Sequence, residues 1–365
     1  MLFYPTDNII FSGMKEISLA LTYDDVLLVP QYSKVHSRTL VDLKTQITKS
    51  FAIDFPVIAV NMDTVVEVDM AVAMSEYGSV ALYPRFKSPA EQALEVAEVL
   101  KRGARTIPAI GIKDEEILRV KALYEIGIRV VTIDVAHAHL EQCLSFLRKI
   151  KKEFKGLEVI AGVVATYEGA RDLFKSGADA VRVGVGPGTI CTTRQVTGSG
   201  VPQITAIMEA AKAGREFGRA IIADGGMKNS GDVVKALAAG ASAVIVGSQL
   251  AGCFECPGEI IEIDGKKYKA YNGSTSKTEK EKQVENYSSD KHNQYTEYVE
   301  GLESFVPYKG PVKDVLAKIE KGIRSGLSYS GAFNIKEFHK KAQFMRVTPT
   351  STNENGAHGV MVNKY

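Results

Sequence analysis

Eight short runs of β-branched and other apolar residues recur along the chain, most of them separated by stretches whose apolar positions have helical spacing. The runs cover residues 56–60, 79–83, 106–111, 129–134, 158–163, 180–185, 219–224 and 242–247. Runs without polar alternation predict strands buried on both faces, as in a parallel sheet covered by helices. The clearest helical patterns cover residues 89–100, 140–154, 167–176 and 232–239. Eight such units predict an α/β fold, a closed (β/α)8 TIM barrel, with a doubly wound open sheet as the alternative.

Two segments interrupt this alternation. The gap between the sixth and seventh runs holds a glycine-rich stretch, residues 186–203. After the eighth run comes a long insertion, and its first part, residues 260–271, predicts a β-hairpin around Asp264-Gly265. Residues 274–298 are rich in Lys, Glu, Ser and Asn, which fits either a disordered surface loop or a mobile lid over the barrel mouth.

The domain organisation follows from these patterns. Helical spacing returns over residues 312–324. We expect one catalytic barrel domain over residues 21–347, with the lid at 272–304 inside it. Residues 1–20 form an N-terminal arm in this interpretation, and the polar residues 348–365 form a C-terminal tail.

Composition narrows the function classes. A formal net charge of +2 gives no sign of a nucleic-acid-binding surface. No apolar run approaches the length of a membrane span, and residues 1–14 lack the features of a secretory signal. The four cysteines, in a chain without such a signal, predict free thiols in a reducing compartment. We therefore expect a cytoplasmic protein with no membrane or nucleic-acid partner.

The ends of the predicted strands carry the candidate chemistry, because function in such barrels lies at the C-terminal ends of the strands. Gly225-Gly226 follows the seventh strand and Gly247-Ser248 the eighth. Glycine lets backbone N–H groups approach an anion closely, so these turns predict a phosphate site. The alternative is that the glycines serve only tight turns.

Cys191 is the candidate nucleophile. It lies in the glycine-rich loop of residues 186–194, and Arg194 follows three positions later. A nearby cation and inward-pointing amides favour the thiolate, which is the reactive form of cysteine. A buried structural cysteine is the alternative. The polar, glycine-rich flanks favour the nucleophile.

Two residue pairs have metal-ligand spacing. His137 and His139 stand two apart after a strand, but the other four histidines lie outside the barrel strands. Cys253 and Cys256 have the spacing of a redox pair or of half a zinc site, and there is no second such pair. Ordinary packing is the favoured interpretation of the cysteine pair, and we expect no metal catalysis at the histidines.

Six segments carry a resemblance to a known family. They are LTYDDVLLVP at 21–30, NMDT at 61–64, GVGPGTICTTR at 184–194, ADGG at 223–226, CPGE at 256–259 and VPYKG at 306–310. Together they make the chain similar, from about residue 20 to residue 347, to the family of inosine monophosphate (IMP) dehydrogenase and guanosine monophosphate (GMP) reductase. The resemblance implies a barrel that is usually tetrameric. It also implies that the loop cysteine forms a covalent thioimidate at purine C2, where a nicotinamide cofactor exchanges hydride.

The resemblance assigns roles by position. It implies that Cys191 is the nucleophile, that Thr193 and Glu300 are the acid/base pair for leaving ammonia in a reductase, and that Asp224 holds the ribose. The other implied nucleotide contacts are Asn61, Gly188, Thr189, Gly225, Gly226, Gly247, Ser248, Tyr271, Gly273 and Ser274. The implied cofactor contacts are Asp134, Val135, Ala136 and Ser276. In the dehydrogenase branch, a monovalent cation such as K+ binds carbonyls that correspond to Gly186, Gly188 and Cys191.

The two branches of the family differ in features that this sequence contains. Most dehydrogenases insert a regulatory domain after the second barrel helix, whereas residues 100–105 here lead directly into the third strand. Residues 273–276, Gly-Ser-Thr-Ser, resemble the Gly-Ser-x-Ser pattern of reductases. Dehydrogenases use a lid arginine to activate water, and residues 274–298 contain no arginine, Lys291-His292 being the nearest substitute. Val163 and Ala138 depart from both branches.

The favoured hypothesis is a GMP reductase that converts GMP and NADPH to IMP, ammonia and NADP, acting as a homotetramer. The first alternative is an IMP dehydrogenase that uses NAD and lacks the regulatory insert. The second is a purine-nucleotide-binding paralogue without turnover.

Overall fold

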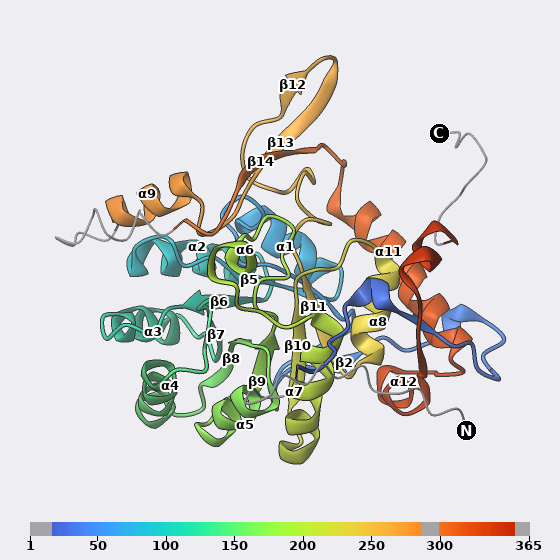
Figure 1. Cartoon of the computed structure of the whole chain (residues 1–365). Helices are drawn as coiled ribbons and strands as arrows, with labels where there is room; N and C mark the ends of the chain where they lie inside the picture. Colours follow the sequence, from blue (N-terminus) through green and yellow to red (C-terminus); the bar gives the residue numbers. More distant parts are fainter. Residues whose placement is uncertain (1–16, 287–298, 355–365) are drawn as a thin grey trace.

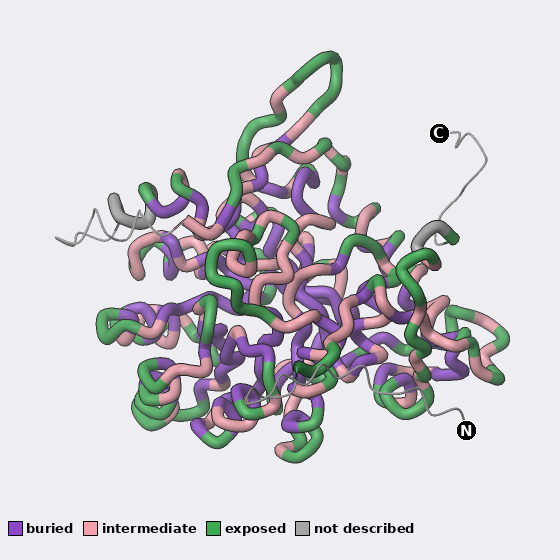
Figure 2. The backbone as a smooth tube through the Cα atoms, viewed as in Figure 1, coloured by how far each residue is buried: buried purple, intermediate pink, exposed green. Residues whose placement is uncertain are grey.

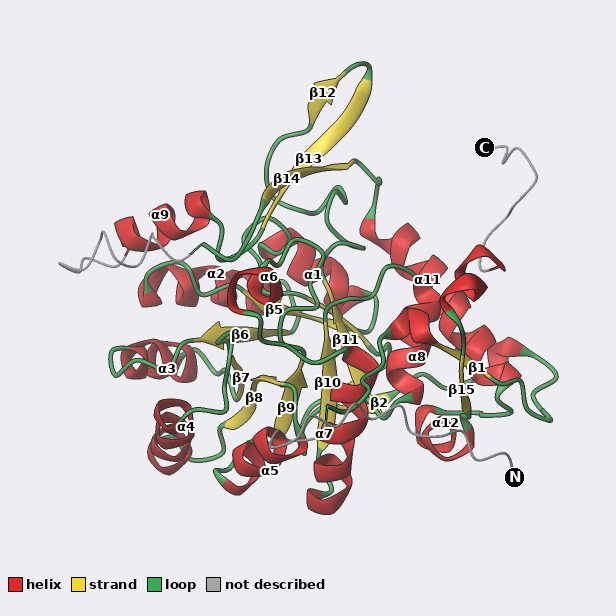
Figure 3. Ribbon diagram, in the orientation of Figure 1, coloured by secondary structure: helices red, strands yellow, loops and turns green. Residues whose placement is uncertain are grey.

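A closed barrel of eight parallel strands forms the centre of the molecule (Figure 3). The structure is a computed structural model and describes residues 17–286 and 299–354. The strands are β4 (Val57–Ala59), β5 (Val80–Tyr83), β6 (Thr106–Ile110), β7 (Val130–Ile133), β8 (Glu158–Val164), β9 (Ala180–Val183), β10 (Ala220–Asp224) and β11 (Ala243–Val246). β11 pairs in parallel with β4 and closes the ring. The predicted TIM barrel is confirmed, and the open-sheet alternative is wrong.

Helices surround the barrel. They are α1 (Val68–Glu76), α2 (Pro89–Lys101), α3 (Glu116–Glu125), α4 (Glu141–Glu153), α5 (Tyr167–Lys175), α6 (Thr193–Thr197), α7 (Gln203–Phe217), α8 (Ser230–Ala238), α9 (Lys277–Asn286), α11 (Val312–Tyr329) and α12 (Ile335–Lys341), with short 3-10 turns at Tyr23–Asp25, Arg38–Leu40 and Pro349–Glu354. Local sequence sets several of the helix starts. Ser88 accepts from the Glu91 amide while the Glu91 carboxylate accepts from the Ser88 amide, a capping box that starts α2. α11 runs past its predicted end at residue 324, because Leu327 continues the buried face of the helix.

The core has two layers, and Figure 2 shows buried positions along the strands and on the inner faces of the helices. The inner layer fills the barrel with side chains such as Ile58, Ile107 and Ile222. Two short strands, β2 (Thr45–Gln46) and β3 (Ala52–Ile53), close the end where the barrel strands begin, since Ile47 and Ile53 join this inner cluster with no exposed surface. The opposite end therefore remains as the barrel mouth.

A small sheet stands over the mouth. The predicted hairpin is confirmed as β12 (Ile261–Ile263) and β13 (Lys266–Asn272), which projects from the body in Figure 1. Asp264 and Gly265 both have positive φ, the backbone that a two-residue hairpin turn requires. β14 (Glu303–Pro307) adds to β13 as a third strand, and elsewhere β1 (Val26–Leu28) pairs with β15 (Phe344–Arg346).

The polar insertion is ordered over its first part. Residues 277–286 form the helix α9, so the disordered-loop interpretation is wrong for this part of the chain. Lys291 and His292 lie outside the described residues. Within the described ranges, no helix has both the length and the apolar character needed to cross a membrane.

Candidate active site

The cysteine loop leaves β9 and reaches α6 across the barrel mouth. Only glycine fits at its start, because a Cβ on Gly184 would lie 2.1 Å from the Asp224 backbone oxygen. Arg194 Nε donates to the Val185 carbonyl at 3.1 Å, and one of its terminal nitrogens donates to the Val201 carbonyl at 2.7 Å. These bonds connect the two ends of the loop through the Arg194 guanidinium.

Cys191, Thr193 and Glu300 form one hydrogen-bonded chain. The Thr193 hydroxyl donates to Glu300 Oε2 at 2.6 Å, and Cys191 Sγ lies 3.1 Å from the same hydroxyl oxygen. Because the Thr193 proton points to Glu300, the Cys191 thiol is the donor to Thr193. Cys191 is exposed. The arrangement gives an accessible thiol with a route for its proton to a carboxylate.

Backbone pairing brings Glu300 to the cysteine loop across 107 positions of sequence. The Thr192 amide donates to the Glu300 carbonyl at 2.9 Å, and the Leu302 amide donates to the Ile190 carbonyl at 3.1 Å. Cys191 and Gly301 face each other in this short antiparallel ladder. Gly301 has no room for a side chain, because a Cβ there would lie 2.9 Å from the Ser276 amide nitrogen. The far end of the insertion is thus fixed against the loop that carries the thiol.

A buried arginine connects three of the expected site residues. Arg182 lies on β9 with 4% of its side chain exposed. Its guanidinium donates to Asp224 at 2.6 and 3.1 Å, to Asp134 at 3.3 Å and to the Asn61 amide oxygen at 3.1 Å. Burial alone would lower the pKa of Arg182, but the carboxylates of Asp224 and Asp134 raise it above its ordinary value. The strand ends of β4, β7 and β10 are therefore joined by one permanent cation.

Space for this arginine depends on a glycine in the neighbouring strand. A Cβ on Gly162 of β8 would lie 2.4 Å from the Arg182 Cβ. Arg182 was not among the expected site residues, since it falls inside a run that predicts a buried strand. A cation in such a run, with acidic residues at the ends of other strands, is the signal that could have identified it.

The glycine turns meet at one side of the mouth. Gly225 and Gly226 both have positive φ and pack against Pro187 of the cysteine loop. The Thr189 and Ser248 hydroxyls lie 3.2 Å apart. A Cβ on Gly247 would lie 3.0 Å from the Tyr271 hydroxyl, and Tyr271 is buried. The structure thus brings together the left-handed turn at Gly225-Gly226, the turn at Gly247 and three hydroxyl groups, which suit an anion.

The first residues of the insertion lie beside its last residues. The Gly273 amide donates to the Leu302 carbonyl at 2.9 Å, and Ser274 is half-buried beside it. Ser276 has no exposed surface, and its hydroxyl accepts from the Glu279 amide at the first turn of α9. Ser276 therefore does not reach the mouth, in contrast to the expected cofactor contact.

The remaining cofactor candidates follow β7. Asp134 is half-buried, with its second oxygen 3.4 Å from Arg85 Nε, and Ala136 is exposed. The Val135 amide donates to the Gly162 carbonyl and its carbonyl accepts from Val163. Val135 therefore has no backbone N–H left for a ligand.

The histidine and cysteine pairs with metal-ligand spacing lie in surroundings that differ from a metal site. His139 Nε2 lies 3.0 Å from a carboxylate oxygen of Asp172, which does not belong to the cysteine loop. Cys253 and Cys256 are buried free thiols, and burial raises the pKa of Cys253 to about 12. Across the described residues, no three His, Cys, Asp or Glu side chains gather closely enough to hold a metal ion.

Lys280 is a second residue that the sequence patterns did not identify. It lies on α9 and is 5% exposed, although its segment is highly polar. Burial lowers the pKa of Lys280 below its ordinary value, and the Glu300 carboxylate opposes that shift. The insertion after β11 therefore carries a buried amine near the Glu300 carboxylate.

We compared the chain with known protein families. Residues 20–358 match the profile of the IMP dehydrogenase / GMP reductase domain. The chain belongs to this family.

Relatives found by sequence are named IMP dehydrogenase, and a solved structure with a similar fold is a GMP reductase. The chain is 34% identical to inosine-5'-monophosphate dehydrogenase from Nitrosopumilus maritimus (strain SCM1), over 95% of this chain and 100% of that protein. It is 36% identical to the enzyme of that name from Cryptosporidium parvum, over 96% and 98%. Its fold matches GMP reductase from Trypanosoma brucei, solved in complex with guanosine 5'-monophosphate, with a TM-score of 0.89 and 28% identity over 94% of this chain and 99% of that one. The chain is thus an oxidoreductase of purine metabolism.

Proposed function

We propose that this enzyme is a GMP reductase, which converts GMP, NADPH and protons to IMP, ammonia and NADP. The observation that carries the proposal is the hydrogen-bonded chain from the Cys191 thiol through Thr193 to Glu300. It supplies a nucleophile and a proton donor on the same side of the mouth, which is what deamination at a purine carbon needs.

The chemistry follows from this chain. Cys191 adds to purine C2 as its proton passes through Thr193 to Glu300. Glu300 then protonates the 2-amino nitrogen, the C2–N bond breaks, and ammonia leaves behind a thioimidate. A reduced nicotinamide supplies, when bound, the hydride that C2 receives. Cys191 departs as a thiolate, and the product is IMP.

The proposed binding residues surround the same opening. Asp224 accepts from the ribose hydroxyls with its Oδ1 atom, because its Oδ2 atom already accepts from Arg182. The turns at Gly225-Gly226 and Gly247-Ser248, with Thr189 and Tyr271, hold the phosphate. Asn61, Gly188, Gly273 and Ser274 lie on the nucleotide side. Asp134 and Ala136 are the residues that fit the nicotinamide side. We also propose a cytoplasmic homotetramer.

IMP dehydrogenase is the second candidate, with NAD as oxidant and a monovalent cation at the carbonyls of Gly186, Gly188 and Cys191. The curated relatives named above carry this name. A dehydrogenase must activate water to hydrolyse its thioimidate, and Lys280 is a buried lid amine with a lowered pKa. Among the described residues of the insertion, its position near Glu300 makes it the best suited to that task in place of arginine.

One assay run in both directions distinguishes the candidates. We expect NADPH oxidation that depends on GMP and releases one ammonia per NADPH, with slow or absent NAD reduction by IMP. Robust formation of xanthosine monophosphate from IMP and NAD, without ammonia from GMP, would identify the dehydrogenase. GMP binding with neither activity would identify a nucleotide-binding paralogue.

A further inference from the structure

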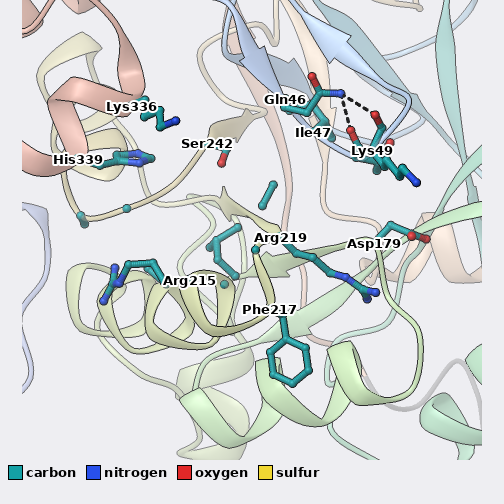
Figure 4. A pocket seen from close by; sticks show the side chains of 18 of the residues that line it. Gln46, Ile47, Lys49, Asp179, Arg215, Phe217, Arg219, Ser242, Lys336 and His339 are labelled. Carbon is teal, nitrogen blue, oxygen red and sulfur yellow. Dashed lines mark hydrogen bonds between the residues drawn. The ribbon is translucent and has the colours of Figure 1, made fainter.

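A second cavity lies at the opposite end of the barrel from Cys191. Its volume is about 840 Å³. It is lined by the ends of α7 and α8, the start of β10, the turn between β2 and β3, and α12 (Figure 4). Ala220 at the start of β10 lines this cavity, whereas Asp224 at the end of the same strand faces the mouth. The two openings are therefore separated by the length of the barrel.

The cavity wall is strongly positive. Its five cationic side chains are those of Lys49, Arg215, Arg219, Lys336 and Lys340. Asp179 is its single carboxylate, and Lys151 already donates to it at 2.7 Å. The whole chain has a formal net charge of only +2. Positive charge is thus concentrated here beyond what the composition of the chain requires.

Most of these cations are not neutralised by the protein. Among the residues that the structure describes, Lys49, Arg215, Lys336 and Lys340 have no carboxylate oxygen within 4.0 Å. Arg219 donates to backbone carbonyls of Phe174 and Ala178. Like charges on a concave protein wall raise the local positive potential and favour an anion inside it.

Helix dipoles explain only part of this pattern. Arg215 lies in the last turn of α7 and Lys340 in the last turn of α12, where a cation stabilises the helix end. Lys336 lies in the first turn of α12, where a cation is unfavourable. Lys49 lies in a turn, and the Gln46 side chain bonds to the Thr48 and Lys49 carbonyls and holds that turn (Figure 4). Neither Lys49 nor Lys336 has a helix-end role.

We propose that this cavity binds a polyphosphate, an anion with two or more linked phosphate groups. The cations come from three separate elements around one space, the turn with Lys49, the end of α7 with Arg215, and α12 with Lys336 (Figure 4). A chain of linked phosphates offers an oxygen group to each of these three elements. Arg215 adds a planar fork suited to phosphate oxygens. The proposal is independent of the reaction at Cys191.

The test is calorimetric titration of the full chain with tripolyphosphate, after GMP has filled the nucleotide site at the mouth. We expect saturable binding that weakens with salt. The triple variant Lys49→Gln/Arg215→Gln/Lys336→Gln should bind at least about tenfold more weakly. All three side chains are exposed, so the variant should keep the wild-type unfolding temperature and turnover.

A matched control removes the same charge elsewhere. Lys101→Gln/Lys113→Gln/Lys121→Gln changes three lysines whose side chains are 81%, 70% and 64% exposed on the α2 and α3 side of the barrel. This control should bind within about twofold of the wild type, because it leaves the cavity unchanged. Equal losses in both variants, or no loss in the cavity variant, would overturn the proposal.

Two further titrants identify the form of the ligand. Inorganic phosphate should bind far more weakly than tripolyphosphate, and equal affinity would contradict a site for linked phosphates. A nucleoside triphosphate that binds more tightly than tripolyphosphate would show that the site takes the tail of a nucleotide. Weaker binding of the nucleotide would show that it takes free polyphosphate.

Discussion

Two sides of the barrel mouth hold their polar and charged side chains in different ways. On the cysteine side, Cys191 is exposed, and its partner Glu300 is fixed by a short backbone ladder between two loops. On the arginine side, Asp224 and Asp134 stand at strand ends and share Arg182, which is buried inside the barrel. One side exposes a reactive group, and the other fixes charges in place.

This difference predicts different consequences of mutation. Groups on the cysteine side contribute little to the core, so changing them should alter rates while the fold keeps its stability. Removing a partner from a buried charge pair leaves the other charge uncompensated, which destabilises by roughly 3–5 kcal/mol. Changes on the arginine side should therefore affect stability and binding together.

The largest expected effect is at Cys191. Cys191→Ala should abolish turnover, because no covalent bond to the purine can form, while GMP affinity stays within about tenfold since the phosphate and ribose contacts remain. Turnover assays and calorimetry on the same preparation measure both quantities. Appreciable turnover by the variant would contradict the covalent mechanism.

Glu300→Gln should lower the turnover number by at least ~100-fold, as loss of a general acid or base commonly does. The amide still accepts from Thr193 but cannot carry the proton to ammonia. The unfolding temperature should match that of the wild type. An equal fall in stability and activity would mean that Glu300 serves the loop ladder more than the chemistry.

Asp224→Ala should weaken GMP binding by at least about a hundredfold, because each of two charge-assisted bonds to the ribose hydroxyls contributes ~1.5–3 kcal/mol. It should also lower the unfolding temperature, since Arg182 loses its nearest carboxylate. Asp224→Asn is the matched control and should lose less stability. Unchanged GMP affinity in the folded variants would show that the ribose lies elsewhere.

The smallest expected effect is at Lys280. If the reaction is GMP reduction, Lys280→Met should change turnover by less than about fivefold, because no water has to be activated. Methionine keeps the length of the buried side chain. A loss of turnover of ~100-fold or more, caused by failure to hydrolyse the thioimidate, would favour the dehydrogenase over the reductase.

The sequence predicted most of the fold because the barrel strands are buried on both faces and therefore stand out as apolar runs. Cys191 and the glycine turns could be proposed from the sequence because each lies in a short motif that can be recognised locally. The sequence did not identify Arg182, whose partners Asn61, Asp134 and Asp224 come from three other strand ends. It also missed the burial of Lys280 on α9, because that burial depends on where the lid packs and not on the local pattern. Glu300 was placed by family resemblance alone.

The central claim is that the chain from Cys191 through Thr193 to Glu300 serves the release of ammonia. The most direct test measures the two half-reactions separately in Glu300→Gln by rapid mixing. Ammonia release from GMP should slow by at least ~100-fold. The reverse hydride step, in which IMP and NADP give NADPH and the thioimidate, should slow by at most about tenfold, because it needs Glu300 only to take up the Cys191 proton, which water can also accept. Equal slowing of both half-reactions, or no slowing of ammonia release, would contradict this account.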